Sequence, residues 1–133
     1  MSIPCDSPDR TQLRRAVEQF NSGEYYACHE TLEELWLCEN EPERNLYKGI
    51  LQVAVGLYHK DQDNLRGAIR LLASGAELLE PFLPMYAGLD LGRLHAEALA
   101  LRDALESGTD PGPTSPPPKH IHIKIINNSV LKK

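Results

Sequence analysis

Several side chains that could do chemistry occur at helical spacing in the run His-Glu-Thr-Leu-Glu-Glu-Leu-Trp, which begins at His29. At about 100° per residue, His29, Glu33 and Trp36 fall within roughly 60° of one another on a helix. Tyr25 and Leu32 share this side, so we expect it to face the core. An unpaired polar group in a core costs about 1–3 kcal/mol. A histidine and a carboxylate directed inward therefore indicate either a polar network or a functional site.

A second line of polar side chains is expected on a helix over residues 42–61. Lys48, Gln52 and His59 fall on one narrow strip of that helix, while its apolar residues are spread around the whole circumference. This pattern is typical of a central, enclosed helix. If the helix that carries His29 is its antiparallel neighbour, the two polar lines lie face to face.

The cluster predicted where these lines meet consists of His29, Glu33, Gln52 and His59, with Lys48 or Arg44 toward one end. Two histidines and a carboxylate (His29, Glu33 and His59) could bind a divalent metal with an open position, as in hydrolytic sites. Alternatively, Glu33 fixes the tautomer of His29 and makes it a general base. The third interpretation is a structural network with nothing bound. In a small-ligand site, Trp36, Lys48, Gln52 and His59 are the expected contacts.

Spacing and composition exclude several classes of protein. His-Glu-x-x-His metalloproteases are disfavoured because position 33 is Glu, and the Glu-x-x-His pairs of di-iron bundles do not occur. A net charge of −5 without a Lys/Arg cluster argues against nucleic acid or an anionic membrane as partner. No apolar run approaches the roughly 18–20 residues of a membrane span. Three cysteines, an odd number, favour reduced thiols and a cytoplasmic location.

The elements that must position these residues are predicted to be helical. Apolar periodicity, capping residues and turn signals predict five helices, at about residues 7–21, 24–40, 42–61, 64–80 and 90–106. Short connections and no good strand before residue 119 favour an all-α fold, a single antiparallel helical bundle. We expect residues 1–106 to form this bundle and residues 107–133 a Pro-rich linker and extended tail.

The tail carries a strict alternation, His120-Ile121-His122-Ile123-Lys124-Ile125. Such a pattern is typical of an extended segment with one apolar edge. Since no partner strand is expected in the chain, the segment must dock across the bundle, pair with a second copy in a homodimer, or stay mobile.

A second functional class fits the same pattern. The segments around Phe20 and Tyr58 both predict an aromatic helix end, a tight turn and a new helix, about 40 residues apart. Paired helical hairpins of this kind superficially resemble tetratricopeptide units, which bind peptides in a groove. In that non-enzymatic interaction module, His29 and Glu33 would line an exposed surface instead of an enclosed site.

Three ordered motifs carry a family resemblance: Phe20-Asn-x-Gly-x-Tyr-x-x-Cys-His-Glu-x-Leu-Glu-x-x-Trp36, Gly49-Ile-Leu-Gln-x-Ala-x-Gly-Leu-Tyr-His59 and Asn64-x-x-Gly-Ala68. Over roughly residues 10–105, the chain resembles the domain-of-unknown-function family numbered three hundred and nine. The resemblance implies a small, all-helical bacterial or archaeal protein, some members being cyanobacterial. Its His-x-x-x-Glu-x-x-Trp signature falls on His29, Glu33 and Trp36, and it implies no activity.

Overall fold

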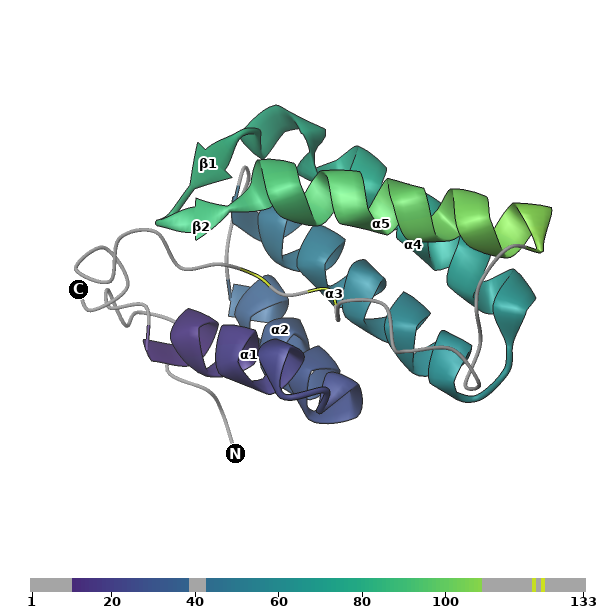
Figure 1. Cartoon of the computed structure of the whole chain (residues 1–133). Coiled ribbons are helices and arrows are strands. Elements are labelled where there is room, and N and C mark those ends of the chain that lie inside the picture. Colours follow the sequence, from purple (N-terminus) through teal and green to yellow (C-terminus); the bar gives the residue numbers. More distant parts are fainter. Residues whose placement is uncertain (1–10, 39–42, 109–120, 122, 124–133) are drawn as a thin grey trace.

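The helices expected from apolar periodicity are present in the computed structural model, which describes residues 11–38, 43–108, 121 and 123 (Figure 1). The described helices are α1 (Thr11–Asn21), α2 (Tyr25–Cys38), α3 (Glu43–Asp61), α4 (Leu65–Leu79) and α5 (Leu91–Ser107). A 3₁₀ turn η1 (Glu80–Phe82) and two short strands, β1 (Met85–Tyr86) and β2 (Leu89–Asp90), connect α4 with α5. The predicted all-α helical bundle is therefore confirmed.

Capping side chains fix where two of the helices begin. The Asn64 side chain accepts a hydrogen bond from the Gly67 N–H at 3.2 Å, and the Asp90 side chain accepts one from the Arg93 N–H at 3.1 Å. Each satisfies a backbone donor that the first turn of a helix leaves unpaired. The start of the first helix expected near residue 7 lies outside the described residues.

The connection between α4 and α5 contains two short strands, although the sequence predicted no good strand before residue 119. Met85 pairs with Asp90, and Tyr86 with Leu89, in a small antiparallel hairpin. The two residues between the strands, Ala87 and Gly88, have φ values of 55° and 77°. Two successive positive φ values are those of the tight turn that matches the twist of a hairpin. The expectation of no strand before residue 119 was therefore wrong at this hairpin.

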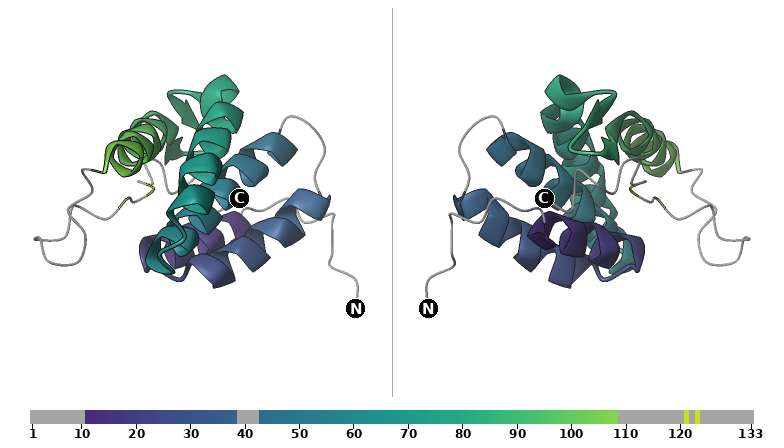
Figure 2. Two further views of the ribbon diagram at one scale, coloured as in Figure 1. Left: turned by 90° about the vertical axis from the view of Figure 1, so that its right-hand side faces the viewer. Right: turned by 90° about the vertical axis from the view of Figure 1, so that its left-hand side faces the viewer.

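Helices that are consecutive in the chain pack against one another, and the α3–α4 contact is the most extensive. As Figure 2 shows, α5 lies on one side of the α3–α4 pair and α2 on the other. Two glycines let α3 and α4 approach closely, because a Cβ atom added at Gly75 would lie only 2.8 Å from the Gly49 carbonyl oxygen. Helix α3 is central, as its apolar pattern predicts.

The core lies between the helices and includes residues of the C-terminal segment. Ile121 and Ile123, drawn in yellow in Figure 1, are 8% and 1% exposed and belong to the same apolar cluster as Phe20 and Leu46. For these two residues, docking across the bundle is the observed outcome. The rest of the tail lies outside the described residues, and the division at residue 106 stays a prediction. None of the described helices is both long and apolar enough to cross a membrane.

Candidate functional site

His29 lies on the outer side of α2, at the edge of the core. Tyr25, Cys28 and Leu32 fill the inner side of the same helix and are buried. His29 itself is half-buried, and its ring lies 5.9 Å from the ring of Tyr26, centroid to centroid. Its Nδ1 atom is buried and has no hydrogen-bond partner among the described residues. This nitrogen carries an unmet hydrogen-bonding capacity at the helix surface.

Four aromatic or imidazole rings form a continuous cluster across α2 and the end of α3. The rings of Tyr26 and Tyr58 lie 6.0 Å apart, and those of Tyr58 and His59 lie 6.2 Å apart. With His29 they make what we call the ring cluster: Tyr26, His29, Tyr58 and His59. Tyr26 is 59% exposed and Tyr58 is 37% exposed, so the cluster is open to solvent. The two histidines are connected through the two tyrosines.

Glu33 departs from its predicted position, because it is exposed. The prediction placed Glu33 on the same core-facing side of α2 as Tyr25 and Leu32. However, Thr31, roughly 120° away from Tyr25 on the helix, is buried and donates a hydrogen bond to the Gln19 side chain of α1 at 2.7 Å. Contact with α1 shifts the buried arc toward Thr31 and leaves Glu33 in solvent. The expectation of an inward-facing carboxylate at Glu33 was wrong.

Gln52 also departs from the predicted cluster. Its Oε1 atom accepts a short hydrogen bond from the Ser74 hydroxyl of α4, so its side chain serves the α3–α4 contact. Gly49, Gln52 and Gly56 have i, i+3, i+7 spacing and therefore share one strip of α3, which faces α4. That spacing was a signal in the sequence for the true direction of Gln52.

His59 lies where α3 turns into α4. It is half-buried, with its Nδ1 atom 3.5 Å from the Asn64 side-chain nitrogen. Its Cδ2 atom would lie 3.1 Å from a Cβ atom added at Gly67. His59 therefore packs into the capping turn of α4 with one side of its ring and contacts Tyr58 with another.

The predicted metal site is not assembled. Within residues 11–38 and 43–108, no group of three His, Cys, Asp or Glu side chains is placed to hold a metal ion. The proposed ligands His29, Glu33 and His59 therefore do not converge, because Glu33 points to water and His59 packs at the end of α3.

Trp36 and Arg44 mark the other end of the α2–α3 contact. The Arg44 guanidinium carbon lies 4.3 Å from the centre of the half-buried Trp36 ring, a cation–π geometry. The Nε atom of Arg44 is buried without a hydrogen-bond partner in the described part of the chain. Leu37 next to Trp36 is 63% exposed, and Lys48, one turn after Arg44, is half-buried.

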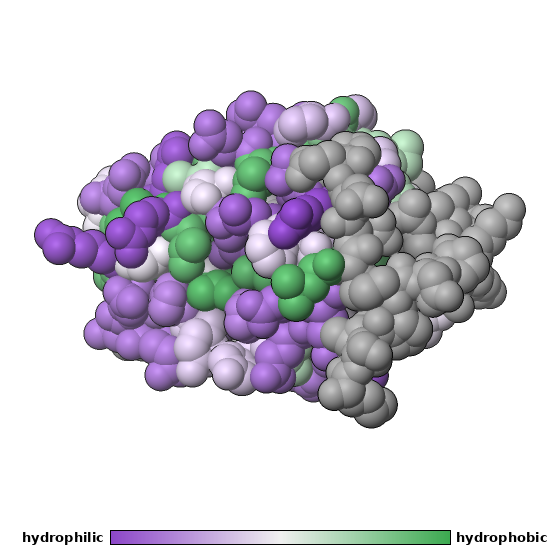
Figure 3. Space-filling view, turned by 180° about the vertical axis from the view of Figure 1, so that it is seen from behind, coloured by the Kyte–Doolittle hydropathy of each residue, from purple (hydrophilic) through white to green (hydrophobic). Residues whose placement is uncertain are grey.

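Together these residues define what we call the α2–α3 face, which consists of the ring cluster with Trp36, Leu37 and Arg44. Figure 3 shows the molecule from the side opposite to Figure 1. Hydrophobic residues form a broken band across the middle of that view, with hydrophilic residues above and below. The α2–α3 face combines exposed rings, an exposed leucine and two buried nitrogen atoms that lack partners among the described residues.

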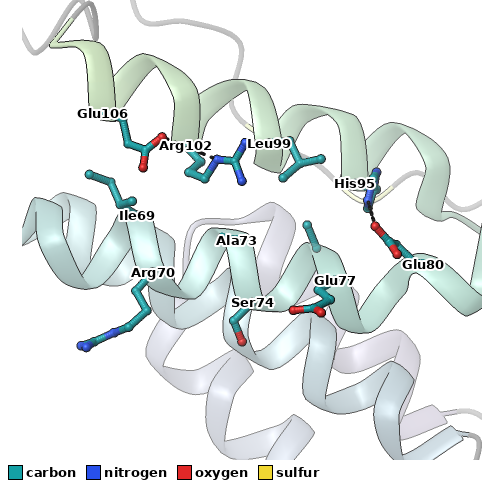
Figure 4. A pocket seen from close by; sticks show the side chains of 11 residues that line it. Ile69, Arg70, Ala73, Ser74, Glu77, Glu80, His95, Leu99, Arg102 and Glu106 are labelled. Atoms are coloured by element: carbon teal, nitrogen blue, oxygen red, sulfur yellow. Dashed lines mark ion pairs between the residues drawn. The ribbon is translucent and has the colours of Figure 1, made fainter.

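A groove between α4 and α5 was missed by sequence reasoning (Figure 4). It has a volume of about 600 Å³, and its lining includes the apolar side chains of Ile69 and Leu99. At one end His95 lies 3.8 Å from the Glu80 carboxylate, and at the other Arg102 lies 4.0 Å from Glu106. Its residues come from α4, η1 and α5 without a recognisable motif, so no signal in the sequence marked the groove.

The inner side of α2 holds two groups whose titration is shifted by the core. Burial raises the pKa of the Cys28 thiol to about 12. The pKa of Tyr25 is also raised, mainly by burial and further by the nearby charges of Asp61 and Cys28. A thiol that holds its proton at neutral pH is a poor nucleophile. Cys28 therefore acts as a small core residue.

Comparison with known proteins places most of these residues in one family match. Residues 13–71 match the family described as Domain of unknown function (DUF309), which confirms the resemblance over that stretch. The whole α2–α3 face lies within the match.

Two relatives match over longer segments. The uncharacterized protein YpuF of Bacillus subtilis (strain 168) is 41% identical over 81 residues, which are 59% of this chain and 47% of YpuF. An uncharacterized protein of Aquifex aeolicus (strain VF5) is 26% identical over 100 residues, 74% of this chain and 30% of that protein. The chain spans less than half the length of either relative.

Proposed function

We propose that this chain is a protein-binding module and that the α2–α3 face is its contact surface. The observation that carries the proposal is the pair of exposed tyrosines, Tyr26 and Tyr58, which touch each other across two helices. Tyrosine, tryptophan and arginine are the residues that most often carry the binding energy of protein interfaces. This face presents all three within one helix pair.

Unmet hydrogen-bonding groups support the same function. Arg44 Nε is a donor, and the ring nitrogen of His29 is a donor or acceptor according to its tautomer. A buried polar atom without a partner costs about 1–3 kcal/mol, which a partner would recover by supplying the missing bond. We therefore expect a peptide segment with apolar side chains for the tyrosines and a carboxylate for Arg44.

The order of helix packing favours the module over an enclosed site. Extensive contacts run from each helix to the next, as they do in proteins built of stacked helical hairpins. Both relatives are more than twice as long as the segment they share with this chain. A domain joined to other segments in longer proteins fits a role in contacting partners.

The test uses peptides selected from a random library for binding to the full chain. A Tyr26→Ser/Tyr58→Ser variant should bind these peptides at least about 30-fold more weakly, as expected for loss of a binding hot spot. A Met85→Ser/Leu65→Ser variant is the matched control, since these residues are 52% and 40% exposed and lie outside the α2–α3 face. Its affinity should change less than about two-fold. Peptides that bind both variants equally well would rule out this face.

The buried nitrogen of His29 favours a second candidate, a small-ligand or divalent-metal site at the ring cluster. The hydrolytic chemistry predicted for His29 with Glu33 has less support, because the carboxylate faces solvent. Thermal shifts with Zn²⁺ and Mg²⁺, measured for the wild type and His29→Ala, test this candidate. A stabilisation that His29→Ala abolishes would favour it over the protein-binding module. The cytoplasmic location stays a prediction.

A further inference from the structure

The side chain of Asn21, the last residue of α1, binds the main chain of a residue more than one hundred positions away. Its Oδ1 atom accepts a hydrogen bond from the Ile123 N–H at 2.7 Å. Its Nδ2 atom donates one to the Ile123 carbonyl oxygen at 3.0 Å. Both main-chain groups of one residue are thus satisfied by one amide side chain.

This pairing recognises a peptide backbone irrespective of its side chains. An asparagine amide offers a donor and an acceptor side by side, as the edge of a neighbouring strand does. Any segment that brings one free N–H and C=O pair to the same place can make these bonds. Asn21 therefore supplies main-chain recognition at the end of α1.

Side-chain recognition comes from the two isoleucines. Ile121 and Ile123 are 8% and 1% exposed, and both belong to the apolar core cluster. Residues two apart point to the same side of an extended chain, so the alternating pattern allows both isoleucines to enter the core. The site therefore selects an Ile-x-Ile segment.

We propose that the surface around Asn21 is a peptide-binding groove whose resident ligand is this chain's own Ile121/Ile123 segment, and that it accepts the same segment from a second copy of the chain. The described contacts between the segment and the bundle are made by Ile121 and Ile123, so the same segment from another molecule can make the same contacts. The intervening residues 109–120 include five prolines and follow α5 directly. Exchange of an identical element between copies is a low-cost route to association.

The experiment uses the full chain, in which substitutions prevent its own Ile121/Ile123 segment from binding. In an Ile121→Ser/Ile123→Ser variant, with folding checked by circular dichroism, the groove is open to a fluorescent peptide of residues 118–126. The peptide should bind this variant at least ten-fold more tightly than the wild type, whose tethered segment competes at a high effective concentration. Adding Asn21→Ala should weaken binding about ten-fold, through loss of two hydrogen bonds.

Controls separate this groove from the α2–α3 face. Adding Ser22→Ala or Tyr26→Ser to the serine variant should leave the affinity unchanged, and a peptide with both isoleucines replaced by serine should not bind. A folded variant that fails to bind the peptide, or that binds it equally well with Asn21→Ala, would overturn the proposal.

A second measurement applies even when the serine variant does not fold. In the wild-type chain, hydrogen exchange of the Ile123 amide should be slowed, because Asn21 holds that N–H. Asn21→Ala should accelerate this exchange at least ten-fold while core amides of α3 keep their protection. Exchange of the Ile123 amide at the rate of an unprotected peptide in the wild type would overturn the proposal.

Discussion

Helix α3 has two different neighbours. Toward α4, glycines bring the helix backbones together, and the one polar pair described above, Gln52 with Ser74, is satisfied. Toward α2, rings remain exposed at one end, and two nitrogen atoms, His29 Nδ1 and Arg44 Nε, are buried without partners in the part of the chain that the structure describes. The polar pair described at the α3–α4 contact is satisfied, whereas the α2–α3 contact leaves exposed rings and unpaired nitrogen atoms that a further molecule could contact. Under the proposed function, stability and binding depend on different sides of one helix.

The largest expected effect comes from forcing α3 and α4 apart. In Gly75→Ala, the new Cβ atom would lie 2.8 Å from the Gly49 carbonyl oxygen and 3.0 Å from the Val53 nitrogen, both in the backbone. Since backbone cannot turn aside as a side chain does, we expect a loss of at least about 3 kcal/mol in the free energy of unfolding. Urea denaturation followed by circular dichroism measures it.

Gly92→Ala is the matched control for this substitution. A Cβ atom there would meet Pro84 atoms at 3.5–3.6 Å, which is ordinary contact. In a helix, alanine is favoured over glycine by up to about 1 kcal/mol, so the variant should be as stable as the wild type or more so. If Gly75→Ala and Gly92→Ala change the free energy of unfolding equally, the backbones of α3 and α4 do not approach each other as closely as described.

The next effect is the pH dependence of stability that results from burial of Cys28 on the inner side of α2. The pKa of Cys28 is raised from 9.0 to about 12 in the folded protein. Between these values the unfolded chain loses the proton and the folded protein keeps it, so stability falls as the pH rises. The expected slope is about 1.4 kcal/mol per pH unit. The raised pKa of Tyr25 acts in the same direction.

Urea denaturation at several pH values above 9 measures this slope in the wild type and in Cys28→Ala. The variant is less stable throughout because of the cavity it leaves, so only the slopes are compared. Its slope should be shallower. Equal slopes in the two proteins would mean that Cys28 ionises in the folded state as readily as in the unfolded one.

The smallest effect tests the polar pair between α3 and α4. Ser74→Ala leaves the Gln52 Oε1 atom without its donor in a half-buried place and should cost about 1 kcal/mol. Replacing both partners, in Gln52→Leu/Ser74→Ala, should recover most of that loss because no unpaired atom remains. Thermal denaturation compares the two. A double variant that is less stable than Ser74→Ala would contradict this expectation. It would show that the Gln52 side chain stabilises the fold by more than its unpaired Oε1 atom destabilises it.

Local signals in the sequence were enough to predict the helices. The caps at Asn64 and Asp90 act within one turn, and apolar periodicity depends only on the 3.6-residue repeat. The central place of α3 also followed from its own residues. By contrast, the hairpin at residues 85–90 depends on a positive φ at Ala87, which alanine rarely adopts.

The candidate site was predicted only in part, because its outcome depends on contacts between distant residues. Trp36 lies against Arg44 where α2 meets α3, and His29 is half-buried at the edge of the core. Whether Glu33 is buried, however, is decided by α1, through the Thr31–Gln19 hydrogen bond. The direction of Gln52 is likewise decided by Ser74, 22 residues away. A pattern on one helix gives the relative angles of its side chains but not the boundary of the core.

Trp36 is the chain's one tryptophan, and it lies beneath the Arg44 guanidinium where α2 meets α3. Indole fluorescence from this protein therefore has a single origin, at the edge of the surface that we assign to binding. An event that separates Arg44 from the indole or covers it should alter the emission, whereas occupation of the α4–α5 groove should leave the spectrum unchanged. The fluorescence of Trp36 in the native chain therefore reports on the side of α3 that faces α2.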